Sequence, residues 1–298
     1  MLSVALLLLP DFLLIGGGAW LRRLPSFPAE FWTGVERLVY FVLFPALLFR
    51  ALASSPLTPG EAGKLLAVVV AFTSGGMLLS ALARPLLRLD EPTFAACFQC
   101  GFRFNTYVAL AVATRLGGDA GVAMLSLMVG VLVPIVNVAA VSVLAQGRGL
   151  RILTELARNP LILACAAGVC WRITGWPLPS FAGRLLQHLA SAALPLGLLA
   201  VGAGLRFAGD ALPLKAVLWW NGVKLVAMPA LALVLALALD LPLLERQMAV
   251  MMAAVPTATS AYILANQMNG RGAPVALLIS TGTLLAAITL PLWLAVVS

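Results

Sequence analysis

The sequence predicts an all-α membrane protein with ten transmembrane helices, arranged as two inverted repeats of five. Three observations support this fold class. Of the 298 residues, 62% are hydrophobic and only 10% are charged, whereas about a quarter of the residues in soluble domains are charged. Apolar runs of about 20 residues, the length of a helix that crosses a bilayer, recur along the whole chain. The two halves of the chain also resemble each other.

Ten apolar segments cover nearly the whole chain. They lie at about 2–21, 31–53, 64–84, 94–116, 120–145, 159–176, 187–206, 214–239, 247–268 and 274–297. The first is too long for the core of a secretory signal and no basic residue precedes it, so we expect it to be retained. More Lys and Arg residues follow the odd-numbered segments than the even-numbered ones. Because basic loops favour the cytoplasmic side, we expect both termini on the non-cytoplasmic side.

The internal repeat appears when the chain is aligned with itself at an offset of 150 residues. The matched pairs are Pro10 with Pro160, Gly18 with Gly168, and Pro45 with Pro195, while Asn105 falls one residue short of Pro256. The predicted units are 1–146 and 159–298, joined by a cytoplasmic linker at 147–158. Since five is an odd number of crossings, the second unit enters the membrane inverted. Inverted repeats are typical of carriers, whose substrate sites lie near the midplane where helices are interrupted.

The fourth and ninth segments are the best candidates for interrupted helices. Pro256 lacks a backbone donor and clashes with the preceding turn, which frees carbonyl groups that Thr257 can partly satisfy. Asn105 and Thr106 lie at the corresponding depth of the fourth segment and could bond to the backbone in the same way. An ordinary proline kink and a packed asparagine are the alternatives.

Two charges of opposite sign, Arg103 and Asp11, lie near the midpoints of their segments. A guanidinium there costs at least ~3 kcal/mol unless it faces a partner or a wet cavity. If the first and fourth segments touch, the two residues could form a structural ion pair. Alternatively, Arg103 binds an anionic substrate, and protonation of Asp11 releases the arginine and couples transport to protons.

Two further polar residues lie inside apolar segments. Lys224 could snorkel or pair with a carbonyl group, and a direct role in function is the less favoured alternative. Asn137 follows Pro134 in the fifth segment. It could line a central cavity or form a hydrogen bond between helices.

Several other functions are disfavoured by the sequence. The basic residues are scattered through short loops, with no nucleic-acid-binding pattern. The Cys97-x-x-Cys100 pair lies in an apolar run without a second pair or nearby histidines, so we predict no metal site. The chain has no H-E-x-x-H motif, no G-x-S-x-G elbow and no phosphate-binding loop. We therefore expect neither an enzyme nor a cofactor.

Several stretches of the chain resemble the auxin efflux carrier family in its bacterial branch. They are LVYFVLFPALLFRALA from Leu38, NPLILACAAGVC from Asn159, GWPLPSF from Gly175, SAALPLGLLAVGAGL from Ser191, VPTATSAYILANQ from Val255 and STGTLLAAITLPLWL from Ser280. The resemblance implies ten helices in two inverted halves, with broken fourth and ninth helices that cross, and a fold related to bile acid sodium symporters. It also implies transport of small organic anions such as malate, malonate or auxin-like carboxylates.

The family's crossover residues correspond to Asn105, Thr106, Pro256 and Thr257. Relatives often continue the Asn-Thr pair with glycines and a proline, whereas this chain reads YVALAVA from Tyr107. This difference leaves open how sharply the fourth helix breaks.

The sequence thus predicts a secondary active transporter for a small mono- or dicarboxylate in the bacterial inner membrane. A channel with a carrier fold, or a membrane sensor, is the alternative. The candidate substrate-binding residues are Arg103, Asn105, Thr106, Asn137, Pro256 and Thr257, and the candidate for proton coupling is Asp11. The expected partners are the substrate anion and the bilayer, with protons as a candidate coupling ion and a homodimer as an open possibility.

Overall fold

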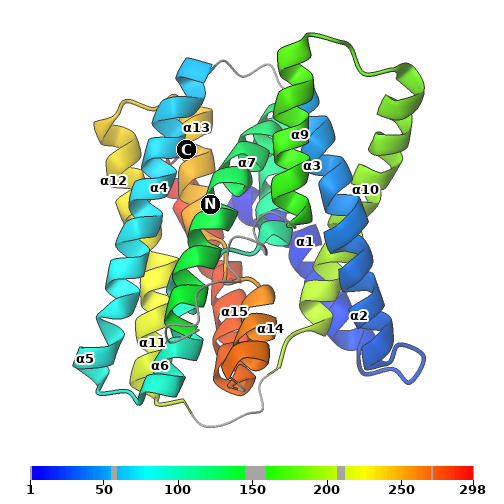
Figure 1. The fold of residues 1–298 in the computed structure, drawn as a ribbon. Helices are drawn as coiled ribbons and strands as arrows, with labels where there is room; N and C mark the ends of the chain where they lie inside the picture. Colours follow the sequence, from blue (N-terminus) through cyan, green and yellow to red (C-terminus); the bar gives the residue numbers. More distant parts are fainter. Residues whose placement is uncertain (1, 55–58, 145–158, 207–211, 270, 298) are drawn as a thin grey trace.

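The computed structural model of the protein describes residues 2–54, 59–144, 159–206, 212–269 and 271–297. Within these ranges the chain is helical and contains no strand (Figure 1). Five helical stretches of the described residues are long and apolar enough to cross a membrane: Gly63–Leu87, Glu91–Leu144, Ser180–Ala203, Leu214–Ala238 and Gly272–Val297. The protein is therefore an all-helical, multi-pass membrane protein.

The helices occupy the positions of the ten expected segments to within a few residues. The first half contains α1 (Leu2–Leu21), α2 (Ala29–Leu38), η1 (Val39–Leu43), α3 (Phe44–Ala53), α4 (Pro59–Ala81), α5 (Ala83–Leu87), α6 (Glu91–Phe98), η2 (Gln99–Gly101) and α7 (Thr106–Leu144). The second contains α9 (Pro160–Thr174), α10 (Ser180–Ala203), α11 (Leu214–Gly222), η4 (Val223–Ala227), α12 (Met228–Ala238), α13 (Leu243–Ala254), α14 (Ser260–Asn269) and α15 (Gly272–Val297). The predicted linker at 147–158 lies outside the described residues.

Local sequence explains where these helices bend or reverse. Within α7, Gly118 has φ 51° and ψ −133°, a conformation that glycine adopts without steric cost. A Cβ on Gly121 would overlap the carbonyl oxygen of Ala113, so the two arms of α7 fold closely against each other. The π-helical turns η1 and η4 end just before Pro45 and Pro229, which cannot donate the regular helical hydrogen bond.

Two helix pairs pack against each other with the same geometry, α1 on α10 and α9 on α3. A Cβ on Gly18 would overlap the carbonyl group of Leu199, and a Cβ on Gly168 would press against that of Phe49. Gly168 follows Gly18 by 150 residues, and Leu199 follows Phe49 by the same 150 residues. The same close contact is therefore made twice, between corresponding positions of the two halves.

The helices form two groups in space. In Figure 1, α1, α2, α3, α9 and α10 lie together on the right, while α4, α11, α12 and α13 lie on the left, with α7, α14 and α15 between them. Each group combines helices from both halves of the chain. The site that is described below is lined by α2, α3, α9 and α10 of the right-hand group and by α7, α14 and α15.

The first prediction concerns the close contact of α1 with α10. A Cβ on Gly202 would overlap the backbone oxygen of Ile15, so Gly202→Ala should lower stability by about 1–3 kcal/mol because the two backbones must move apart. The measurement is the midpoint of thermal unfolding in detergent. Gly222→Ala is the matched control, since nothing lies within 4 Å of its added Cβ. An equal loss in both variants would contradict the packing described.

Candidate functional site

Two helical interruptions meet in the interior of the protein. The first lies at 102–105, between η2 and α7, and the second at 255–259, between α13 and α14. The backbone N–H of Asn105 donates a hydrogen bond to the carbonyl oxygen of Pro256, at 2.8 Å. Both interruptions expected from the sequence are present, so the alternative of two continuous helices is wrong.

The first interruption is stabilised by side chains rather than by a proline. The Oδ1 atom of Asn105 accepts hydrogen bonds from the N–H groups of Tyr107 and Val108, at 3.0 and 3.3 Å, and so caps the start of α7. The hydroxyl of Thr257 donates to the carbonyl oxygen of Cys100, at 2.7 Å. This explains how the chain breaks although YVALAVA lacks the glycines and proline of its relatives.

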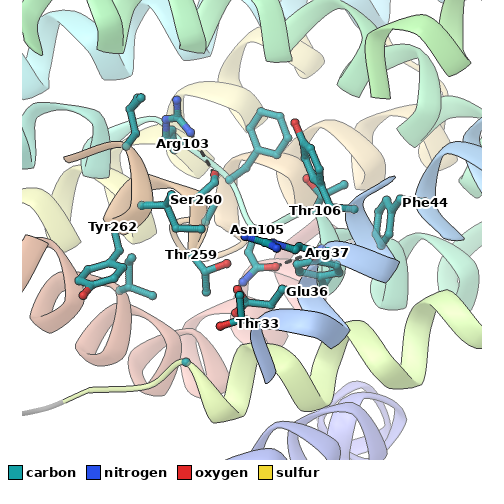
Figure 2. Close-up of a pocket in the computed structure, with 18 of the residues that line it drawn as sticks. Thr33, Glu36, Arg37, Phe44, Arg103, Asn105, Thr106, Thr259, Ser260 and Tyr262 are labelled. Carbon is teal, nitrogen blue, oxygen red and sulfur yellow. Dashed lines mark hydrogen bonds between the residues drawn. The ribbon is translucent and has the colours of Figure 1, made fainter. Parts of the chain in front are cut away.

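A cavity of about 920 Å³ lies beside the junction of the two interruptions (Figure 2). This volume is at the upper end of the range for small-molecule sites. Its lining comes from α2, η1, α3, α9 and α10, from the two interruptions, and from α7, α14 and α15. The polar lining residues include Arg22, Thr33, Glu36, Arg37, Tyr40, Arg103, Asn105, Thr106, Asn137, Asn159, Arg206, Thr259, Ser260 and Tyr262.

The central side chain of this cavity is Arg103. It is 6% exposed, and its guanidinium donates to Ser260 Oγ at 3.0 Å and to Asn137 Oδ1 at 2.5 Å. Its Nε atom is buried without a hydrogen-bond partner, and none of the ion pairs among the described residues involves it. Arg103 is thus a buried cation that is held by neutral groups and faces a cavity, an arrangement that favours an anion.

The rest of the lining adds to this preference for anions. Asn105 is 1% exposed, and its Nδ2 atom also has no hydrogen-bond partner within the described structure. Three more arginines line the cavity, Arg22, Arg37 and Arg206, and Glu36 is the one acidic residue of the lining among the residues that the structure describes. The positive excess attracts small anions into the cavity.

Four of the six residues expected to bind substrate line the cavity: Arg103, Asn105, Thr106 and Asn137. Pro256 and Thr257 do not belong to the lining. Their contacts with Asn105 and Cys100 hold the two interruptions together. They therefore position the site rather than face its interior.

The suggested ion pair between Asp11 and Arg103 is wrong. Asp11 instead pairs with Arg115, whose Nε and Nη2 atoms donate to the two carboxylate oxygens at 2.6 and 3.0 Å. Arg115 lies within α7, which contacts α1, whereas Arg103 lies in the interruption that precedes α7. Asp11 is also not one of the residues that line the cavity.

The sequence analysis missed several residues of the cavity wall. Arg37 and Arg206 were counted only as loop charges that orient the protein, although both line the cavity. The guanidinium of Arg206 lies over the ring of Tyr262, 5.2 Å from its centroid. Glu36 was the one feature of the sequence that could have indicated this part of the cavity wall, because it is an acidic residue within the expected apolar segment at 31–53.

The apolar helical fold, with a buried arginine at the junction of two interruptions, is that of a membrane transport protein. Residues 148–294 match the family described as membrane transport protein. A putative malonate transporter from Rhizobium meliloti (strain 1021) is 28% identical over 301 residues, which cover 90% of this chain and 87% of the relative. An uncharacterized transporter from Methanothermobacter thermautotrophicus is 28% identical over 151 residues, or 50% of this chain and 49% of the relative.

The match over residues 148–294, together with the similarity to the putative malonate transporter, confirms the predicted resemblance of the chain to the auxin efflux carriers.

The second prediction tests the pairing of Asp11. The effects of Asp11→Asn and Arg115→Gln on the free energy of unfolding should be strongly non-additive, because the two residues share a bidentate ion pair. We expect an interaction energy of about 1–2 kcal/mol in a double-mutant cycle. This value is reduced for solvent screening, since the Arg115 side chain is 29% exposed. Unfolding midpoints in detergent measure it. A cycle of Asp11→Asn with Arg103→Gln is the control and should be additive to within ~0.5 kcal/mol.

Proposed function

We propose that the protein is a secondary active transporter that moves a small organic anion across the bacterial inner membrane by alternating access. The observation that carries this proposal is the state of Arg103, a buried cation without a carboxylate partner in the described structure. It lies at a cavity that α2, α3, α9 and α10 line together with α7, α14 and α15. A group of that kind deep in an apolar protein marks a substrate pathway.

The proposed architecture is ten transmembrane helices in two inverted repeats. The repeated contact of Gly18 with Leu199 and of Gly168 with Phe49 supports it, because a repeat predicts the same packing at corresponding positions. The meeting of Asn105 with Pro256 also supports it, since these residues lie at corresponding depths. The positions of the basic loop residues favour both termini on the non-cytoplasmic side, although the predicted linker lies outside the described residues. The homodimer stays a prediction.

A small mono- or dicarboxylate is the proposed substrate. The Nε atom of Arg103 and the Nδ2 atom of Asn105 are hydrogen-bond donors without partners, and a carboxylate is the group that such donors bind best. The relative from Rhizobium meliloti is described as a putative malonate transporter, which makes malonate the first probe. Since the cavity is lined both by α2, α3, α9 and α10 and by α7, α14 and α15, a rocking motion between these two sets of helices would expose it to one side at a time.

A carrier can be distinguished from a channel or a sensor by counterflow. Proteoliposomes loaded with unlabelled malonate should accumulate labelled malonate transiently against its concentration gradient if the protein is a carrier. A channel lets the label equilibrate without accumulation, and a sensor takes up none. Either of these results would contradict the proposed mechanism.

The third prediction concerns Arg103 itself. Arg103→Gln should weaken malonate binding by about 30-fold or more, because a charge-assisted hydrogen bond to a buried anion is worth about 2 kcal/mol or more. The malonate-dependent increase of the unfolding midpoint measures binding without requiring transport. Arg184→Gln is the matched control, an exposed arginine outside the cavity lining, and should bind malonate like the original protein. Equal binding by both variants would exclude Arg103 from the site.

We further propose that Glu36, rather than Asp11, makes anion binding sensitive to pH. Within the described part of the chain, Glu36 is the single acidic residue of the cavity lining, and it interacts electrostatically with Arg206. Its carboxylate therefore competes with a substrate anion for the positive charges of the cavity. Protonation of Glu36 removes this competition, so anion affinity should rise as the pH falls. Asp11 is already neutralised by its bidentate pair with Arg115.

The fourth prediction tests this assignment. When the affinity is expressed per fully ionised malonate, that of the original protein should rise about three- to tenfold towards acidic pH, as expected for one charge added to a partly wet cavity. Glu36→Gln should show high affinity at every pH, because glutamine imitates the protonated acid. Asp11→Asn should keep the original dependence. The reverse pattern would return the proton-coupling role to Asp11, as the sequence first suggested.

A further inference from the structure

A second buried cation, Lys224, lies next to the other interruption. It is 1% exposed, and its Nζ atom donates a hydrogen bond to the carbonyl oxygen of Ala253, at 2.7 Å. None of the ion pairs among the described residues involves it. It is also absent from the lining of the cavity. The anion site therefore does not explain why a charged lysine is buried there.

The group that Lys224 contacts is the carbonyl end of a broken helix. In a continuous helix the carbonyl of Ala253 would accept from the N–H of residue 257. Here α13 ends at Ala254, and Val255 adopts an extended conformation, with φ −63° and ψ 145°. The last carbonyl groups of α13 thus carry the negative end of the helix dipole into the protein interior.

The first interruption shows that a neutral donor can satisfy such carbonyl groups. The hydroxyl of Ser80 donates to Phe98 O, at 2.5 Å, and that of Thr257 donates to Cys100 O, at 2.7 Å. Hydrogen bonding alone therefore does not require a lysine at the end of α13. What Lys224 supplies, and a hydroxyl would not, is a positive charge.

The fold holds Lys224 at this point. Lys224 belongs to the π-helical turn η4, which contacts α13, α4 and α15. The carbonyl of Leu225 has no regular helical donor because Pro229 lacks an N–H group, and the indole of Trp293 on α15 donates to it instead, at 2.8 Å. The hydrogen bond from Trp293 thus holds η4 in place, and η4 in turn fixes the position of the Lys224 ammonium group.

The repeat relates the two buried cations. Ala253, whose carbonyl accepts from Lys224, lies 150 residues after Arg103. At the first interruption this position is Arg103, which carries the cationic side chain itself. At the second interruption the corresponding position is Ala253, whose backbone carbonyl binds the cationic side chain of Lys224. The first cation faces the cavity and the second faces a helix end.

We propose that Lys224 is a tethered counter-cation that occupies the place of a free monovalent cation at the carbonyl end of α13. Unwound carbonyl groups and the carbonyl ends of interrupted helices are where coupling cations bind in carriers. With this place filled by an ammonium group of the chain itself, anion movement needs no sodium ion. Removing the ammonium opens a site for a small cation such as sodium, potassium or methylammonium. The prediction that transport is independent of sodium rests on the proposed function. The prediction of a latent cation site, the place that the Lys224 ammonium leaves at the carbonyl of Ala253 when it is removed, does not.

The test of the latent site uses the purified protein. Lys224→Ala should lower the unfolding midpoint by several degrees, and about 100 mM sodium, potassium or methylammonium chloride should recover a large part of the loss. Choline chloride at equal ionic strength should recover none, because choline is too large for the vacated space. The original protein should respond to none of these salts beyond the choline baseline. A thiol-reactive dye can follow unfolding in variants that also carry Cys170→Ser, because Cys170 is exposed whereas Cys97, Cys100 and Cys165 are buried.

Lys224→Met is the matched control, because methionine fills much of the same space without opening a cation site. It should be destabilised and should not be recovered by any cation. The proposal is overturned if small cations fail to stabilise Lys224→Ala more than choline does, or if they stabilise Lys224→Met and the original protein equally well.

A measurement on the original protein keeps the proposal testable if Lys224→Ala does not fold. Malonate counterflow should proceed at the same rate, to within about twofold, in sodium, potassium and choline media. Counterflow that requires sodium would overturn the proposal while leaving the transport function intact. Counterflow that is absent in every medium would instead count against the proposed function, and the thermal measurements would still decide the role of Lys224.

Discussion

The structure depends on one constraint, that backbone polar groups in an apolar interior must find partners within the protein. Each helical interruption exposes N–H and carbonyl groups at a depth where water does not compensate them. The hydrogen bond from Asn105 to the carbonyl of Pro256 joins the two interruptions directly. The side chains of Asn105, Thr257 and Ser80 satisfy the neighbouring groups. The interruptions are therefore stable because they meet, and neither would be expected to persist alone.

This constraint also explains why polar residues are concentrated in one part of an otherwise apolar chain. Once the junction exists, its polar backbone can lie beside a cavity, and the cavity allows Arg103 to be buried without a carboxylate. The same arginine in an uninterrupted helix facing lipid would be strongly destabilising. The ion pair of Asp11 with Arg115 belongs to a different part of the protein, where it joins α1 to α7.

The sequence was informative about properties that are set by local patterns. Apolar periodicity predicted the helical fold and the helix positions, and Pro256 together with the repeat predicted both interruptions. It was less informative about partners, because the length of an apolar run does not say which helices touch. Asp11 was assigned to Arg103 for this reason, although its partner is Arg115. Arg37 and Arg206 were missed because a basic residue near the end of a segment looks the same whether it faces solvent or a cavity.

The proposed repeat implies a nearly symmetrical framework, and the proposed function depends on where this symmetry is broken. Arg103 corresponds to Ala253 at an offset of 150 residues, so one interruption contributes a cationic side chain and the other only a backbone carbonyl. Two symmetrical arginines would place like charges around one junction and repel each other at low dielectric. With Arg103 facing the cavity and Lys224 bonded to the end of α13, each positive charge meets a different negative partner. In the proposed mechanism, Arg103 is thereby left free to bind an exchangeable anion, while Lys224 stays bonded to the helix end.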